Sequence, residues 1–150
     1  MTTIDVVDEA DLPELLTLMR GYCDFYEVDP PDDALLAMSR VLIEDPERQG
    51  TQLIARDDDG RAVGFATIFW TWSTLSADRL GVMNDLFVSQ DARGGGVADA
   101  LITACTDQCG QRGVPELAWQ TAKTNARAQA VYDRVGGHRE RWLDYWLAVD

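Results

Sequence analysis

The composition of this chain of 150 residues already excludes several classes of protein. Its share of hydrophobic residues, 46%, suffices for one buried core, and we predict a single domain over residues 1–150. The chain has 26 acidic and 13 basic residues, a formal charge of −13, which makes nucleic acid an unfavourable partner. The same charge suits either attraction of a cationic small molecule or solubility alone.

The sequence also bears on the compartment and on metals. No apolar run approaches the roughly 20 residues of a membrane span, and the first residues lack the order of a secretory signal, so we expect a cytoplasmic protein without a membrane partner. Three cysteines cannot all pair within one chain, so reduced thiols are expected. Cys105 and Cys109 have the spacing of half a metal site, but His138 is the only histidine and we expect no metal.

Helices are expected early in the chain. Thr3–Val7 reads as a short strand, followed by Asp8, an acid suited to a helix start. Apolar residues then recur at helical spacing around Leu12–Met19. The pair Pro30-Pro31 separates this helix from a second one that extends to about Glu44.

The middle of the chain is rich in strand-forming residues. Gln52–Arg56 and Ala62–Trp72 are predicted strands, and the turn Asp57–Gly60 joins them as a hairpin because it ends in Asp-Gly. A third strand is predicted at Val82–Val88.

The second half alternates between helix and strand. We predict a helix over 97–112, a strand at Leu117–Thr121, a helix from Asn125 to Gly136 and a closing strand at Arg141–Val149. The fold class expected from this order is α+β (mixed α/β), with a mostly antiparallel sheet flanked by helices and one strand–helix–strand unit.

A glycine-rich junction at Arg93–Ala98 stands between the third strand and the helix that follows it. Glycines let a backbone approach an oxyanion, and the free amides of a helix start point at it, so a pyrophosphate suits this place. Neither a P-loop nor a dinucleotide loop fits, because no Lys-Ser/Thr follows the glycines and residue 99 is Asp99 rather than glycine. By itself, the glycine run is also compatible with a merely flexible turn.

Two motifs carry a resemblance to a known family. The pyrophosphate-loop pattern Arg/Gln-x-x-Gly-x-Gly/Ala is matched by Arg93, Gly96 and Ala98 within Arg93-Gly94-Gly95-Gly96-Val97-Ala98. About 30 residues downstream, the pattern Asn-x-x-Ala-x-x-x-Tyr-x-x-x-Gly is matched by Asn125, Ala128, Tyr132 and Gly136. In both motifs and their order, the chain resembles the GCN5-related N-acetyltransferase (GNAT) superfamily, which implies a GNAT-like twisted central sheet.

The resemblance implies acetyl-CoA as cosubstrate and a set of residues that bind it. Phe87 and Val88 would offer backbone groups to the pantetheine arm, and Asn125 would help to fix that arm. The pyrophosphate would be held by the loop that Arg93 opens, through the amides of Gly94, Gly95, Gly96, Val97 and Ala98.

Two further residues are candidates for catalysis. The resemblance places Tyr132 near the thioester sulfur, where a phenol can protonate the leaving thiolate; the alternative is a tyrosine that only packs on a helix face. Asp85 lies on the strand before the loop and is the candidate base for the acceptor ammonium. Binding of a cationic substrate, or pairing with an arginine, is the alternative role for Asp85.

The expected reaction is direct transfer of the acetyl group to a primary amine, with a small cationic, polyamine-like or amino-acid-like compound favoured. Tyr26 and Glu27 fall between the early helices, where they would wall the acceptor pocket or serve packing and surface only. A protein or peptide acetyltransferase and a CoA-binding regulatory module are the alternatives. Trp142 and Trp146 fit either a homodimer contact or one buried sheet face.

Overall fold

The computed structural model describes all residues from 1 to 150, which form two compact units, Met1–Gln120 and Thr121–Asp150. The first unit holds the sheet and three of the four α-helices, and the second holds the last helix. No helix in either unit is long and apolar enough to cross a membrane. The single domain expected over residues 1–150 stays a prediction.

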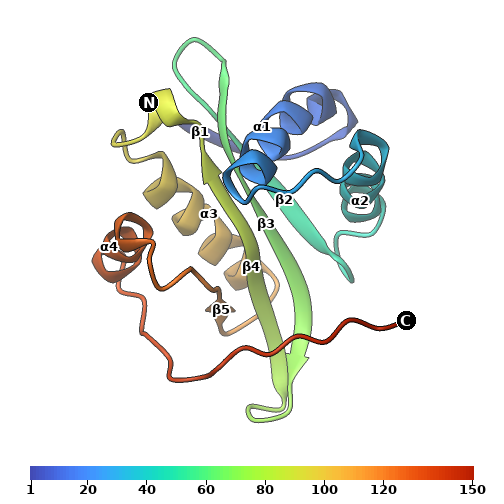
Figure 1. The fold of residues 1–150 in the computed structure, drawn as a ribbon, viewed down its shortest axis with the longest axis vertical. Helices are drawn as coiled ribbons and strands as arrows, with labels where there is room; N and C mark the ends of the chain where they lie inside the picture. The colour runs from blue at the N-terminus through green and yellow to red at the C-terminus, as the bar shows by residue number, and fades with distance from the viewer. The chain divides into compact units, whose positions relative to one another are not determined.

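The first unit is built on one sheet of five strands in the order β1-β2-β3-β4-β5. Neighbouring strands run antiparallel except β4 and β5, which are parallel at Gly81–Leu117 and Val82–Ala118. The long hairpin of β3 and β4 forms the middle of the sheet (Figure 1). The strands are β1 (Thr3–Val6), β2 (Gly50–Arg56), β3 (Ala62–Ser73), β4 (Asp78–Val88) and β5 (Leu117–Ala118).

Helices α1 (Leu12–Phe25) and α2 (Asp32–Glu44) lie on one side of this sheet, and α3 (Val97–Gln111) lies on the other (Figure 1). Phe65 of β3 belongs to the core formed with α1, whereas a side chain at the preceding residue, Gly64, would meet Val97 and Leu101 of α3. Because successive strand residues face opposite ways, these contacts assign the two faces. The predicted mixed fold and the strand–helix–strand unit, β4-α3-β5, are confirmed.

The first helices begin close to where the Asp8 signal and the proline pair led us to expect. Asp8 caps a short 3-10 helix, Glu9–Asp11, by accepting a hydrogen bond from the Ala10 amide at 2.9 Å, and α1 continues from it. Helix α2 starts directly after Pro31 with two acids in its first turn, which suits the positive end of the helix dipole. Helix α1 buries a stripe of apolar side chains, as its spacing predicts. Helix α2 fully buries only Leu42 and Ser39, and it packs Leu35 and Leu36 partly buried against the core.

An irregularity in β4 decides which way its residues face. Met83 pairs with Ile68 of β3, and Asp85 pairs with Thr67, so Asn84 is an extra residue that pairs with neither. A bulge of this kind shifts the alternation of side chains by one place. As a result Asp85 shares the face of Thr67, on the side of α1, although Met83 two residues earlier faces the other way.

The second unit contains α4 (Ala126–Arg134). The side chain of Asn125 caps it, accepting a hydrogen bond from the Ala128 amide at 3.1 Å. At its end Gly136 adopts φ +89°, and the Gly137 amide donates to the Tyr132 carbonyl at 2.9 Å, which closes the last turn. The helix predicted between Asn125 and Gly136 is confirmed.

Two predictions about strands need correction. The strand predicted at Leu117–Thr121 is shorter, since β5 comprises only Leu117–Ala118. The closing strand predicted at Arg141–Val149 is wrong, because these residues form no regular secondary structure. Alternating aromatic residues show only that a segment is able to cover one face of a sheet, whereas a strand also needs a partner for its backbone hydrogen bonds.

Candidate active site

The glycine loop lies between the end of β4 and the start of α3. Gly94 and Gly96 adopt φ +85° and +82°, in the left-handed region that side chains with a Cβ rarely occupy. A Cβ at either position would meet no atom within 4 Å, so the backbone here borders open space. The glycines therefore serve the path of the chain and access to its backbone, rather than close packing.

Helix α3 presents its first amides to this loop. The first i→i−4 hydrogen bond of the helix runs from Ala100 to the Gly96 carbonyl at 3.0 Å, and no side chain caps the helix. The amides of Val97 and Ala98 precede that bond, where helix amides have no partner within the helix. Together with the helix dipole, they form a cradle that fits an anion.

Polar contacts tie the loop to the sheet. Arg93 donates from Nε to the Val88 carbonyl at 3.0 Å, which folds the loop back on the end of β4. Ser89 donates to the Val63 carbonyl from both its amide, at 2.8 Å, and its hydroxyl, at 3.0 Å. These bonds fix the position of the cradle relative to β3 and β4.

The strand edge that leads to the loop has no neighbouring strand on one side. Within the sheet β5 pairs with Gly81 and Val82 only, so β4 from Met83 to Val88 has no strand partner beyond β3. Phe87 and Val88, the residues expected to contact a pantetheine arm, belong to this edge and are half-buried. Their backbone groups on that side suit an extended ligand that pairs with a strand.

Asp85 lies in the same stretch of β4, and 7% of its surface is exposed. Burial raises the pKa of this carboxyl, because a charged form loses its hydration in the interior. Hydrogen bonds act against this shift of the pKa, from Thr67, Tyr22 and the neighbouring Asn84, whose Nδ2 donates at 3.0 Å. No arginine pairs with the group, so the alternative of an Asp85–arginine pair is not what the structure contains.

Tyr22 of α1 lies beside Asp85, within a group of aromatic rings. Its phenol donates to the Asn84 carbonyl at 3.4 Å, and burial with the Asp85 carboxylate nearby raises the pKa of that phenol. The Tyr22 ring lies 5.0 Å from the Tyr26 ring and 6.3 Å from the Phe87 ring, measured between centroids. The structure thus links Tyr26, a residue predicted to contact the acceptor, to Asp85 through Tyr22.

Glu27 lies at the start of the connection from α1 to α2, and its backbone conformation and amide hydrogen bond hold it there. It adopts φ +57°, which is uncommon for a residue with a side chain, and its amide donates to the Asp24 carbonyl at 3.1 Å. Arg20 of α1 clamps the end of this connection, through Asp29 at 3.1 Å and Asp32 at 2.6 Å. The predicted pocket wall is therefore an ordered connection, exposed at Glu27 and half-exposed at Tyr26.

Tyr132 and Asn125 belong to the second unit. Tyr132 is half-buried on α4, and Asn125 uses its Oδ1 as the helix cap. The asparagine of the motif thus has a structural task that the sequence argument did not include. The roles of both residues in the site stay predictions.

Sequence reasoning missed two residues that contact Asp85 directly or through one neighbour. Thr67 of β3 pairs in register with Asp85, and Gln52 of β2 donates to Thr67 at 3.1 Å. A single threonine and a single glutamine in apolar strands carry no signal of their own. Only the pairing of three strands brings them together.

The cysteines form no reactive or metal-binding group. All three are buried and free, and burial raises the pKa of the Cys105 thiol to about 12. No group of three or more His, Cys, Asp or Glu side chains has the arrangement of a metal site.

Comparison with known proteins assigns the family. Residues 14–137 match the Acetyltransferase (GNAT) family. The chain is 28% identical over 141 residues to the uncharacterized N-acetyltransferase YhfO of Bacillus subtilis, covering 93% of each chain. It is 32% identical over 128 residues to the D-amino-acid N-acetyltransferase HPA3 of Saccharomyces cerevisiae, covering 84% of this chain and 78% of the yeast protein.

Solved structures agree on the fold. The aminoglycoside N-acetyltransferase AAC(6')-Iy in complex with a bisubstrate analog of CoA superposes with a TM-score of 0.86 at 24% identity, covering 99% of each chain. A probable acetyltransferase gives the same TM-score at 23% identity, covering 99% of this chain and 98% of the other.

These matches define an acyltransferase enzyme with the GNAT fold, as the two motifs led us to expect. The chain belongs to the GNAT family and is an N-acetyltransferase.

Proposed function

We propose that this enzyme transfers the acetyl group of acetyl-CoA directly to a primary amine of a small cationic compound. Asp85 is the residue that binds this amine and takes its proton. The observation that carries the proposal is the position of Asp85. It is a buried carboxylate on the open stretch of β4, adjoined by tyrosines and followed along the chain by the glycine loop.

The fit of the loop to CoA supports acetyl-CoA as cosubstrate. Gly94 and Gly96 leave open space beside the backbone, and α3 directs free amides toward it. When bound, acetyl-CoA supplies the acetyl group as an activated thioester. The amides of Gly94, Gly95, Gly96, Val97 and Ala98 hold the pyrophosphate, while Phe87, Val88 and Asn125 hold the arm.

The acceptor ammonium must lose a proton before its nitrogen can attack. Asp85 takes this proton, and its raised pKa makes it a stronger base than an exposed aspartate. The new N–C bond forms as the C–S bond breaks, Tyr132 gives its proton to the departing sulfur, and the second proton of the nitrogen restores the phenol. Tyr26 and Glu27 line the approach of the acceptor.

Names of relatives also favour a small acceptor. The yeast relative is a D-amino-acid N-acetyltransferase, and the AAC(6')-Iy complex contains an analog that joins CoA to acetylneamine. Both relatives are named for small amines, although these differ in charge and size. For the present chain, the acidic composition and Asp85 favour the cationic members of this class.

The test is a thiol-release assay with acetyl-CoA and a panel of acceptors. The panel contains polyamines, both enantiomers of basic and neutral amino compounds, and lysine-containing peptides. We expect turnover with small cationic amines. Turnover with peptides alone would identify a protein acetyltransferase, and CoA binding without turnover on any amine would identify a regulatory module.

A further inference from the structure

A row of polar side chains crosses the core of the sheet on the side of α1. Gln52 of β2 pairs in register with Thr67 of β3, and Thr67 pairs with Asp85 of β4. The exposed fractions of the three residues are 2%, 0% and 7%. Three cross-strand neighbours that are all polar and all buried are unusual in a core, where polar groups need hydrogen-bond partners.

The contacts of Gln52 settle the orientation of its amide. Its Nε2 lies 3.1 Å from Thr67 Oγ1 and 3.9 Å from Met19 Sδ. The Met19 thioether only accepts hydrogen bonds, so the group that faces it must be the NH₂ and not the oxygen. Ser39 donates to the same sulfur at 3.7 Å, which leaves the sulfur surrounded by donors.

This orientation determines where the hydroxyl proton of Thr67 goes. An NH₂ group only donates, so Thr67 Oγ1 accepts from Gln52 and keeps its single proton for another acceptor. Asp85 is the neighbour of Thr67 across the β3–β4 pair and is the acceptor on that side, where Thr67 lowers the pKa of its carboxyl. The hydrogen bonds of the row therefore run in one direction: Gln52 donates to Thr67, and Thr67 donates to the Asp85 carboxylate.

Helix α1 lies on the other side of Asp85. Tyr22 is the titratable group in contact with Asp85 there, and Cys23 and Tyr26 lie behind it as neighbours of Tyr22. No cation contacts the carboxylate from α1, β3 or β4. Its charged form thus depends on donors alone, and Thr67 is the donor from within the sheet.

We propose that Thr67 and Gln52 are positioning residues for Asp85, which hold its carboxylate toward the side of α1 and stabilise its charged form. This inference rests on the proposed function in one respect, that Asp85 serves the reaction. The bulge at Asn84 turns Asp85 to this face. There the Thr67 hydroxyl, held by Gln52, is a fixed donor opposite the carboxylate.

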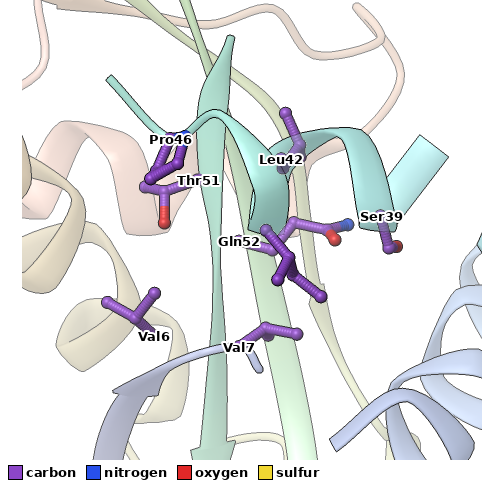
Figure 2. Close-up of a pocket in the computed structure, with 8 residues that line it drawn as sticks. Val6, Val7, Ser39, Leu42, Pro46, Thr51 and Gln52 are labelled. Atoms are coloured by element: carbon purple, nitrogen blue, oxygen red, sulfur yellow. The ribbon is translucent and has the colours of Figure 1, made fainter. Parts of the chain in front are cut away.

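The start of the row adjoins a small cavity. Gln52 Oε1 is buried without a hydrogen-bond partner, and Gln52 is among the residues around a cavity of about 60 Å³ between β1, α2 and β2. Figure 2 shows the Gln52 side chain reaching from β2 toward Ser39 of α2. This volume has room for water, which would donate to Oε1 and complete the bonding of the amide.

The test measures the pKa of Asp85 in the whole protein by ¹³C NMR of its carboxyl, with Asp85→Asn used to assign the signal. Thr67→Val keeps the shape and removes the donor, and we expect the pKa of Asp85 to rise by about one unit. Thr67→Ser keeps a hydroxyl and should restore the pKa. Thr51→Val is the matched control, because Thr51 is also a buried threonine of the sheet but pairs with Ile68 rather than with Thr67.

A second variant guards against loss of folding. Gln52→Met removes the amide at similar length and leaves Thr67 in place, so a smaller rise of the same sign is expected. Thermal melts establish that each variant is folded. An unchanged Asp85 pKa in folded Thr67→Val and Gln52→Met overturns the inference.

Kinetics separate this inference from the proposed function. If Asp85 is the base, the acid limb of the kcat profile moves to higher pH in Thr67→Val together with the NMR pKa, while KM for acetyl-CoA stays constant. A shifted NMR pKa with an unshifted kcat profile supports the positioning of Asp85 but removes Asp85 from the chemistry.

Discussion

Asp85 is a buried carboxyl group without a cationic partner. Burial favours its neutral form, three side-chain donors favour its anion, and the net result is a raised pKa. A structural carboxylate in such a place would more commonly pair with arginine, as Asp11 does with Arg56 at 2.7 Å. The absence of that cation leaves Asp85 able to accept a proton or a cationic amine.

The raised pKa has a consequence for stability. Native Asp85 binds its proton more tightly than in the unfolded chain, so this group lowers stability as pH rises from its ordinary pKa, about 4, through the higher folded pKa. We expect Asp85→Asn to lose this part of the pH dependence. Urea titrations of both proteins between pH 4 and 8 should give a stability difference that shifts in favour of the variant as pH rises. A difference independent of pH would contradict the raised pKa.

Tyr132 is the residue for which the motif makes the sharpest kinetic prediction. Tyr132→Phe removes only the phenol oxygen, so turnover should fall by roughly 10- to 1000-fold, the range for loss of a positioned acid. Acetyl-CoA affinity should change little. Stopped-flow turnover and calorimetry measure the two quantities. Equal turnover would leave Tyr132 with a packing role on α4.

At the scale of elements, the proposed CoA site depends on the backbone geometry of the junction between β4, the glycine loop and α3. Gly94→Val and Gly96→Val place a branched side chain at φ +85° and +82°, which costs about 1–2 kcal/mol and redirects the loop amides. Since no neighbour would clash with the new Cβ, the fold should persist while CoA affinity falls at least tenfold. Calorimetric titration with CoA measures this loss.

The same helix offers a matched control. Gly110 lies near the end of α3, and a Cβ there would also meet no atom within 4 Å. Its φ is not in the left-handed region, so Gly110→Ala should raise stability by about 0.5–1 kcal/mol and leave CoA affinity unchanged. If the loop variants also bind CoA as the wild type does, the loop has no part in binding.

Sequence periodicity predicted the helices well because each one is a local structure. The helix predicted over 97–112 is α3, Val97–Gln111, and the second early helix ends at Glu44 as predicted. Strand pairing is not local, which is why the closing strand at Arg141–Val149 was wrong and β5 is short. A helix satisfies its own backbone, whereas a strand depends on a neighbour that the pattern does not identify.

The same distinction applies to the site. Motifs located the glycine loop, and the place of Asp85 before it made that residue a candidate. The partners of Asp85 were not predictable, because they depend on the register of β2, β3 and β4 and on the extra residue Asn84. Sequence spacing contains no such register.

At the scale of the whole molecule, only a few of the many acidic residues lie where they would affect an acceptor amine directly. Most surface carboxylates either pair with arginines or lie in water, where salt screens them beyond roughly 8 Å. An acceptor amine would respond mainly to carboxylates near its path, namely Asp85 and Glu27. On the proposed function, the formal charge of −13 would act mostly on the encounter with a cation, and the two local acids would act on its binding.

These two contributions, the overall negative charge and the two local acids, predict that the acceptor is a small cationic amine. Added salt should raise the apparent KM for such an amine by weakening both contributions, while KM for acetyl-CoA, an anion, should not rise in the same way. Asp85→Asn should raise the amine KM at low salt and reduce kcat, because it removes the local charge and the base together. Steady-state kinetics at 20 and 300 mM salt, with cationic and neutral amines of similar size, measures these effects. Neutral amines that react as fast as cationic ones, with no salt dependence, would refute the charge argument and leave the N-acetyltransferase activity of the family untouched.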